Sequence, residues 1–129
     1  MKIKLAAVVV FYKPSSSNIN NYLKYIDSVD KLYVVDNSDD DIKRIKETPK
    51  IEYIKLGENK GIAYALNVGA RKAILEGYEY LLTMDQDSKI TSKIVNEMVD
   101  FLKNNQDEKI GLVSPYHDIK TFEVKPTKK

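Results

Sequence analysis

The chain contains no cysteine and only one histidine, His117. The absence of cysteine excludes disulfide bonds and every metal site built on thiolates. A single imidazole also excludes a zinc site that needs several histidine ligands. Two common kinds of metal centre are therefore ruled out by composition alone.

The chain also lacks a strong charge of one sign and a long apolar run. Its net charge of +2 over 129 residues is too small to indicate a nucleic-acid partner. No stretch approaches the ~20 apolar residues that span a membrane. The charged start and apolar core of residues 1–11 resemble a signal peptide, but Pro14 interrupts the pattern and no cleavage site follows. We therefore expect no transmembrane segment and a cytoplasmic location, with a peripheral position at the inner face of the membrane as the alternative.

What is present indicates a globular domain of alternating strands and helices. Hydrophobic residues make up 43% of the chain and charged residues 31%, as in soluble folded proteins. β-branched apolar segments predict strands at residues 3–11, 32–35, 51–56, 78–84 and 110–113. Helical spacing predicts helices at residues 18–28, 62–76 and 94–102. Three acids, Asp39 to Asp41, predict a further short helix that ends before Pro49, because carboxylates favour a helix N-terminus. This alternation predicts an α/β fold with a mostly parallel sheet flanked by helices, a Rossmann-like arrangement.

The longest predicted helix has an apolar stripe that we expect to be buried. The stripe consists of Ile62, Ala63, Leu66, Ala70, Ala73 and Ile74. Gly69 lies inside the same helix, where it costs about 1 kcal/mol relative to alanine. We therefore expect close packing around Gly69.

Polar or aromatic clusters follow four of the predicted strands. They are Phe11-Tyr12, Asp36-Asn37, Asn59-Lys60-Gly61 and Asp85-Gln86-Asp87. In a parallel sheet the ligand site lies beyond the carboxyl ends of the strands. The four clusters should therefore meet at one edge of the sheet.

Asp85 and Asp87 form an Asp-x-Asp pair at the end of a buried strand. If the backbone stays extended, their Cα atoms lie roughly 7 Å apart and both side chains face the same side. Two carboxylates held this close favour a cation between or beside them, and Mg²⁺ or Mn²⁺ takes such oxygen ligands. The alternative is a solvated turn, because Asp and Ser both favour turns.

The other clusters have binding and structural interpretations side by side. Asp36 suits a hydrogen bond from a nucleobase N–H or a ribose hydroxyl, or else an ordinary N-cap or turn role. Tyr12 suits a flat wall over a base, or is a strand-end tyrosine. Asn59 and Gly61 bracket a loop that enters a helix, where free backbone N–H groups suit anions and where Asn59 also suits a cap.

Four segments together resemble the N-terminal nucleotide-binding half of the family 2 glycosyltransferases of the GT-A fold, and the rhamnosyltransferase-like members most. The segments are residues 9–14 (Val-Val-Phe-Tyr-Lys-Pro), 34–38 (Val-Val-Asp-Asn-Ser), 58–69 (Glu-Asn-Lys-Gly-Ile-Ala-Tyr-Ala-Leu-Asn-Val-Gly) and 81–88 (Leu-Leu-Thr-Met-Asp-Gln-Asp-Ser). The resemblance covers residues 5 to about 115.

The resemblance implies a sugar transfer from a nucleotide diphosphate donor, dTDP- or UDP-linked, to a saccharide or lipid-linked acceptor hydroxyl, with inversion. By that likeness Phe11 and Tyr12 form the base pocket and Asp36 reads the pyrimidine. Three further residues, Asn59, Gly61 and Ala63, line the ribose and base side. Asp85 approaches the ribose, and Asp87 binds the Mg²⁺ or Mn²⁺ that bridges the diphosphate.

The sequence departs from the family pattern in two places and covers only part of it. Many relatives carry Ala-Arg-Asn where this chain has Ala65-Leu66-Asn67, and Lys13 stands where asparagine is frequent. The family's catalytic base lies downstream of the fifth strand. We therefore expect residues 1–115 to be a nucleotide-sugar-binding domain, and the polar, lysine-rich tail 116–129 to begin an acceptor-binding region. The base itself is expected beyond Lys129.

Two other classes of function remain as alternatives. A non-catalytic nucleotide-sugar-binding remnant would carry the same donor-site residues. A receiver-type signalling module has a similar length and strand count, but it expects an acidic pair after the first strand and a lysine after the fifth. Here Phe11-Tyr12-Lys13 and Ser114-Pro115 stand at those positions.

Overall fold

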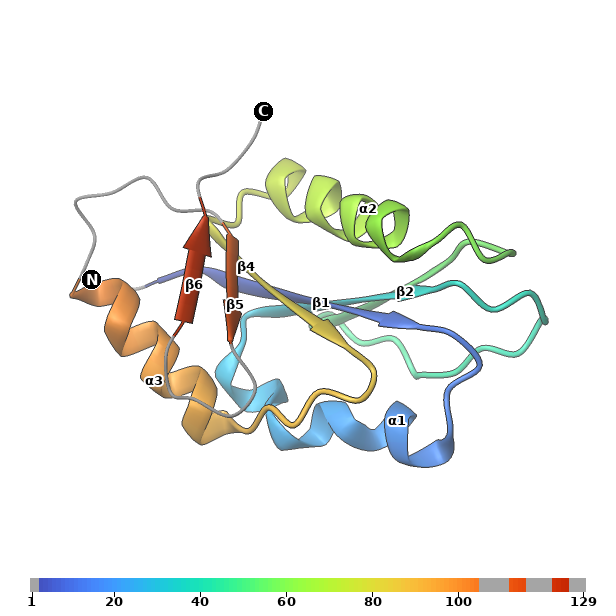
Figure 1. The fold of residues 1–129 in the computed structure, drawn as a ribbon, viewed down its shortest axis with the longest axis horizontal. Coiled ribbons are helices and arrows are strands. Elements are labelled where there is room, and N and C mark those ends of the chain that lie inside the picture. The colour runs from blue at the N-terminus through green and yellow to red at the C-terminus, as the bar shows by residue number, and fades with distance from the viewer. Residues whose placement is uncertain (1–2, 105–111, 116–121, 126–129) are drawn as a thin grey trace.

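The computed structural model describes residues 3–104 and, as strands, residues 112–115 and 122–125. Figure 1 shows the arrangement of the elements. In chain order they are β1 (Leu5–Phe11), α1 (Ser16–Asn20), η1 (Asn21–Lys24), η2 (Ile26–Ser28), β2 (Lys31–Asp36), β3 (Ile51–Lys55), α2 (Ile62–Leu75), β4 (Tyr80–Asp85), α3 (Ser92–Lys103), β5 (Leu112–Pro115) and β6 (Phe122–Lys125).

The described strands form one sheet in the order β3-β2-β1-β4-β5-β6. Neighbouring strands from β3 to β5 run parallel, and β6 runs antiparallel to β5. Helix α2 covers one face, while α1 and α3 lie on the other (Figure 1). Because both faces are covered, every residue of β1 is buried, as the continuous apolar run predicts. The predicted α/β class with a mostly parallel sheet is confirmed.

Helix α2 lies close to the sheet through small residues. Its buried positions are Ala65, Gly69 and Ala73. A Cβ added to Gly69 would lie only 2.4 Å from Val8 Cγ2, so the predicted close packing is confirmed. The predicted buried stripe is wrong for Ile62 and Ile74, which are 57% and 51% exposed, and for Ala63, which is also exposed. The small side chains let the helix backbone approach the strands, which turns the bulkier apolar residues outward.

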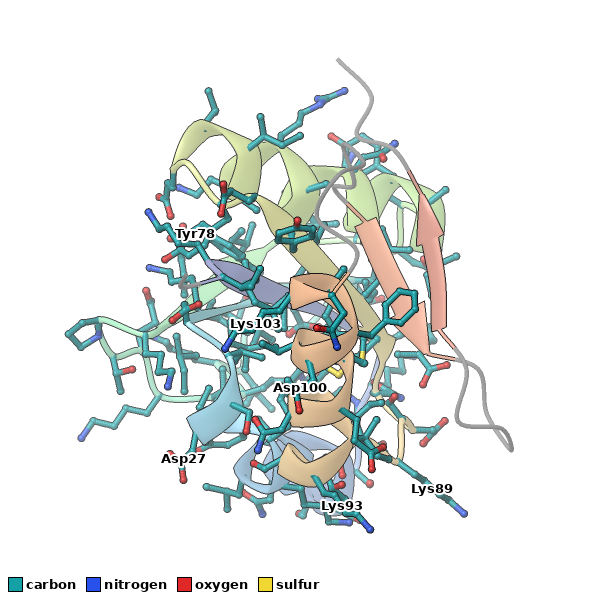
Figure 2. All side chains as sticks on the ribbon, turned by 90° about the vertical axis from the view of Figure 1, so that its left-hand side faces the viewer. Asp27, Tyr78, Lys89, Lys93, Asp100 and Lys103 are labelled. Atoms are coloured by element: carbon teal, nitrogen blue, oxygen red, sulfur yellow. The ribbon has the colours of Figure 1, made fainter. Side chains whose placement is uncertain are left out.

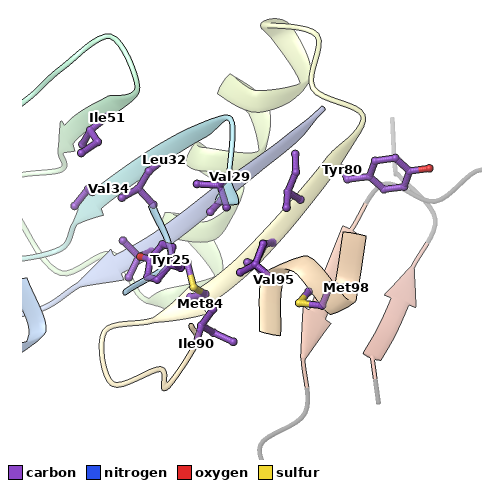
Figure 3. Packing of buried hydrophobic residues seen from close by; sticks show 14 of the residues in the cluster. Tyr25, Val29, Leu32, Val34, Ile51, Tyr80, Met84, Ile90, Val95 and Met98 are labelled. Carbon is purple, nitrogen blue, oxygen red and sulfur yellow. The ribbon is translucent and has the colours of Figure 1, made fainter. Parts of the chain in front are cut away.

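Helix α3 follows its predicted pattern. Val95, Met98 and Leu102 are buried against the sheet, and Figure 3 shows the first two within this core cluster. The opposite face carries charged residues, among them Lys93, Asp100 and Lys103 (Figure 2). Thr91 caps the helix by accepting a hydrogen bond from Ile94 N at 3.4 Å.

The helix predicted at residues 18–28 is present as three short pieces. Helix α1 begins earlier than predicted because Ser15 caps it, in a capping box with Asn18. Two 3₁₀ turns, η1 and η2, then continue the segment to Ser28. Tyr25, between the two turns, is buried in the core beneath them.

The short helix predicted from Asp39 is absent, and residues 37–50 contain no helix. Polar groups of this segment bond both to the neighbouring strands and to one another. Arg44 donates to the carboxylates of Asp36 and Asp40, and Lys55 Nζ donates to the carbonyl of Asp40. The prediction rested on acidic residues at a helix N-terminus, but Asp40 bonds through its carbonyl to Lys55 of β3 and through its carboxylate to Arg44, which also pairs with Asp36 of β2.

Strand β6 was not predicted. It lies in the segment expected to be a polar tail, and it pairs with β5 from Pro115↔Phe122 to Leu112↔Lys125. The other residues of that segment, including His117, lie outside the described part of the chain, as do residues 110 and 111 of the predicted fifth strand. The division of the chain at residue 115 stays a prediction.

Among the helices that the structure describes, none has the length and apolar character needed to cross a bilayer.

Candidate functional site

The carboxyl ends of the parallel strands bring the predicted clusters to one edge of the sheet. In the sheet register Phe11 lies beside Asp36, and Val10 lies beside Asp85. The loops that follow these strands therefore start next to one another. The loop before α2 is tied to the same edge, because Leu56 N donates to the carbonyl of Asp36 at 3.0 Å.

Asp36 is fully buried, and its carboxylate is held by neighbours in the chain. Its Oδ1 accepts from Ser38 N at 3.0 Å, which makes a turn of the Asx kind. Its Oδ2 accepts from Arg44 Nε at 3.2 Å and from the Tyr53 hydroxyl. The structural role considered from the sequence, that of a turn residue, is thus present. A role in reading a base stays a prediction, and it requires a nucleobase to share these oxygens or to displace Arg44 or Tyr53.

Arg44 links Asp36 to Asp40 and was not selected from the sequence. Its side chain is only 9% exposed, and it forms ion pairs with both carboxylates. Burial lowers the Arg44 pKa, but the contacts with Asp40 and Asp36 outweigh it and leave the pKa raised. The same contact lowers the pKa of Asp40. The i,i+4 spacing of Asp40 and Arg44 is a local signal that could have indicated this pair.

Asn37 joins three loops through its backbone and side chain. Its N–H donates to the carbonyl of Phe11 at 2.7 Å, and its Nδ2 donates to the carbonyl of Gly61 at 3.3 Å. Its Oδ1 accepts from Lys60 N at 3.2 Å. Asn37 is almost fully buried, so these bonds fix the loop before α2 against the end of β1.

Ser38 completes the same junction. Its side-chain oxygen accepts from Lys13 N at 2.8 Å. Lys13 has a φ of +43°, a left-handed conformation that is uncommon for a residue with a side chain. The loop after β1 is thus bent over Ser38, and the Tyr12 ring before the bend is 44% exposed. Phe11 itself is buried in the core cluster, and its role in a base pocket stays a prediction.

Gly61 sets the start of α2. It is the N-cap, with a φ of +86° that favours glycine, and its N–H donates to Asn59 Oδ1 at 3.0 Å. The first helical bond runs from Ala65 N to the carbonyl of Gly61 at 3.2 Å. The amides of residues 62–64 precede that bond and lie at an exposed helix N-terminus, where N–H groups suit an anion. Ala63 is exposed there, and its role in lining the ribose and base side stays a prediction.

The acidic loop turns immediately after β4. Ser88 N donates to the carbonyl of Asp85 at 3.2 Å, and Asp87 N donates to Asp85 Oδ1 at 3.1 Å. The backbone is therefore not extended through Asp87. Both aspartates are exposed. Asp87 Oδ1 accepts from Asn18 Nδ2 at 2.9 Å.

Gln86, between the two acids, anchors this loop to the loop after β1. Its Oε1 accepts from Tyr12 N at 2.9 Å, and its Nε2 donates to the Tyr12 carbonyl at 3.1 Å. These two hydrogen bonds have the pattern of a backbone pair between neighbouring β-strands. They hold the loop that carries Asp85 and Asp87 beside Tyr12. The sequence places Gln86 in the acidic cluster but gives it no role, because nothing in a lone glutamine shows its partner.

The donor set suits a hard divalent cation that brings other ligands with it. Within residues 3–104 no group of three or more His, Cys, Asp or Glu side chains gathers to hold a metal. Asp85 and Asp87 each keep an Oδ2 with no hydrogen-bond partner among the described residues. Mg²⁺ is commonly bound through one or two carboxylates together with water and substrate phosphates. The two aspartates fit that mode and do not form a complete cage.

Comparison with known proteins agrees with this fold. The sheet and its flanking helices define a GT-A-like α/β fold. A model of the family "Glycosyl transferase family 2" matches residues 17–129, and the chain therefore belongs to glycosyltransferase family 2. The resemblance stated from the sequence is confirmed.

Two relatives show how far the likeness extends. The chain is 30% identical over 116 residues to the dTDP-rhamnosyl transferase RfbF of Shigella flexneri, which covers 88% of this chain and 39% of RfbF. It is 33% identical over 79 residues to the poly-beta-1,6-N-acetyl-D-glucosamine synthase of Staphylococcus aureus (strain COL), which covers 61% of this chain and 18% of the synthase. The chain thus spans less than half the length of either relative.

Proposed function

We propose that this chain binds the nucleotide diphosphate sugar donor of a glycosyl transfer reaction. The observation that carries the proposal is a hydrogen-bonded connection of four loops at one sheet edge. Gln86 joins the acidic loop to Tyr12, Ser38 joins the loop after β2 to Lys13, and Asn37 joins it to Gly61. A nucleotide diphosphate needs a base pocket, an anion site and a cation site together, and these loops supply candidates for all three.

Within this proposal each loop has a separate role. Tyr12 lies over the base, with Phe11 beneath it. Asp36 accepts from the pyrimidine when the base shares its oxygens with, or displaces, Arg44 or Tyr53. Asn59, Gly61 and Ala63 line the ribose and base side, and Asp85 approaches the ribose. The exposed start of α2 also offers amides to negative charge.

Asp87 is proposed to hold a divalent cation, Mg²⁺ or Mn²⁺. When bound, such a cation offsets the negative charge that develops on the leaving diphosphate. Asp87 contributes a fixed carboxylate, and its exposure leaves room for water and phosphate ligands.

The likeness to RfbF supports a dTDP-linked donor and rhamnose as the sugar, with UDP-linked donors as the second candidate. The proposed reaction inverts the sugar carbon, and its acceptor is a saccharide or a lipid-linked saccharide. We place the reaction in the cytoplasm, with the inner face of the membrane as the alternative.

The proposal assigns donor binding to this chain and acceptor deprotonation to residues outside it. The chain matches 39% of the length of RfbF, which leaves most of that relative without a counterpart here. A positioned general base typically contributes 10²–10⁴-fold to such a step. A non-catalytic nucleotide-sugar-binding protein would keep the same donor site.

Calorimetric titration with UDP and dTDP, with and without Mn²⁺, tests the proposal. We expect binding that weakens on addition of EDTA. Asp87→Asn should lose the Mn²⁺ dependence, and Asp85→Asn should lower nucleotide affinity while keeping more of that dependence. The exposed Asp100→Asn on α3 is the control and should bind like the unchanged chain. Equal binding with and without chelator would contradict the metal role.

A further inference from the structure

Asn18 is the side chain of α1 that reaches the acidic loop. Its Nδ2 donates to Asp87 Oδ1 at 2.9 Å and to the Gln86 carbonyl at 3.2 Å. Its Oδ1 accepts from Ser15 N at 3.0 Å. One side-chain amide thus caps the start of a helix and holds a carboxylate 69 positions away in the sequence.

The partners of Asn18 determine which way its amide faces. A reversed amide would set Oδ1 against the Asp87 carboxylate and the Gln86 carbonyl, three acceptors together. It would also set Nδ2 against the Ser15 N–H, two donors together. Only the observed orientation gives every group a complementary partner. The capping box therefore fixes a neutral N–H donor toward Asp87.

That bond makes the hydrogen bonding of the two carboxylate oxygens of Asp87 different. Oδ1 is held by the amide, and Oδ2 has no hydrogen-bond partner among the described residues. The hydrogen bond fixes the rotation of the carboxylate without adding a charge. A lysine at position 18 would pair with the carboxylate and repel a cation, which an amide does not do.

We propose that Asn18 is a positioning residue that orients Asp87 toward a divalent cation. The inference rests on the proposed function, since it concerns the same site. Asn18 acts through Asp87 and touches no ligand itself. Groups that hold a metal ligand in place generally raise metal affinity, because the ligand loses less freedom on binding. The structure also supplies a comparison in Asn21, whose Nδ2 donates to the Ser88 carbonyl at 2.7 Å in the same loop but contacts no carboxylate.

The test measures Mn²⁺ affinity by electron paramagnetic resonance, in the chain without nucleotide and again with UDP or dTDP. Asn18→Ala should weaken Mn²⁺ binding by roughly tenfold, the lower end of the effect of such partners. Asn21→Ala and Ser15→Ala are the controls. The first removes a bond to the same loop, and the second removes the Ser15 half of the capping box. Both should change Mn²⁺ affinity by less than about twofold, a small fraction of the loss expected at Asn18.

A double-mutant cycle separates positioning from a general structural effect. If Asn18 acts through Asp87, Asn18→Ala should add nothing to nucleotide affinity measured with Mn²⁺ once Asp87→Asn is present. Asn18→Ser, whose side chain is too short to span the gap, should repeat the loss if Asn18→Ala does not fold, as judged by circular dichroism.

An Asn18 variant that folds and binds Mn²⁺ no more weakly than the Asn21 variant overturns the inference. So does a loss that persists in the Asp87→Asn background. Both results leave the proposed function standing. Failure of the unchanged chain to bind Mn²⁺ or nucleotide overturns the proposed function and this inference together.

Discussion

The structure gives Asp36 hydrogen-bond partners that its sequence context does not show. Its carboxylate lies between Ser38, Arg44 and Tyr53 with no exposed surface. Removing one partner of a buried ion pair leaves a charge without compensation, which costs about 3–5 kcal/mol. Asp40 remains as a second partner of Arg44, so the cost here should fall toward the lower end.

We therefore predict that Asp36→Ala lowers the free energy of unfolding by about 3 kcal/mol. Urea denaturation followed by circular dichroism measures this value. Asp40→Ala, which removes the exposed partner of Arg44, is the control and should cost less than about 1 kcal/mol. A midpoint unchanged from the parent chain would show that Asp36 has no structural role, and would leave base recognition as its only function.

The site residues divide into those that a sequence shows and those that only a fold shows. Asp85, Asp87 and Gly61 stand in short patterns at strand ends, and such patterns have a physical meaning without a partner. Gln86 and Asn18 act through partners 74 and 69 positions away. No local pattern encodes those bonds, so their roles could not be derived before the structure.

At the scale of elements, the contact between α2 and β1 depends on one missing side chain. A Cβ at position 69 would meet Val8 Cγ2 at 2.4 Å and Val8 Cβ at 3.1 Å. Both atoms belong to a branched side chain buried in the middle of β1, so neither can move away at little cost. Overpacking of this kind usually costs about 1–3 kcal/mol.

Gly69→Ala should therefore destabilise the chain by up to about 2 kcal/mol, because a gain of about 1 kcal/mol in helix propensity offsets part of the overpacking cost. Thermal unfolding of Gly69→Ala, Val8→Ala and the double variant measures the effect. The double variant should be more stable than the sum of the two single losses predicts. Asn67→Ala, exposed on the same helix, should be neutral or stabilising. A stabilised Gly69→Ala would show that the helix does not lie this close.

The elements that were predicted well are those whose packing follows their own pattern. β1 is buried on both faces, and α3 presents Val95, Met98 and Leu102 at helical spacing. The helix predicted in the segment 37–50 is absent because Arg44 bonds to Asp36 of β2 and the Asp40 carbonyl accepts from Lys55 of β3. A local sequence pattern does not show such contacts between distant segments. β6 was missed although Phe122-Glu123-Val124-Lys125 alternates in the way an edge strand does, because its lysine-rich surroundings favoured a tail.

At the scale of the whole molecule, the ionisation of buried tyrosines makes the stability of the fold depend on pH. Burial raises the pKa values of Tyr25, Tyr33 and Tyr53, and hydrogen bonds to Glu76 and Asp36 raise the last two further. A pKa above the unfolded value of 10.0 means that the folded chain holds its proton more tightly. The resulting stability is complete below pH 10 and is lost as the pH rises above it.

We predict that the free energy of unfolding changes little through this effect below pH 10 and falls steeply above it. Ultraviolet titration of tyrosinate should show two groups among the nine tyrosines. The exposed group should ionise reversibly, and the buried group should ionise only as the circular dichroism of the fold is lost. Ionisation of all nine in one step, with the fold intact, would contradict the buried positions.

The central claim is that a nucleotide diphosphate binds at the carboxyl edge of the sheet. Two-dimensional amide NMR of the labelled chain, titrated with dTDP or UDP and Mg²⁺, tests it most directly. We predict that the shifted amides cluster at residues 11–13, 36–38, 59–64 and 85–88. The backbone amide signals of Lys93, Asp100 and Lys103, on the outer face of α3, should not shift (Figure 2). Shifts confined to other surfaces, or no shifts at millimolar nucleotide, would contradict the account.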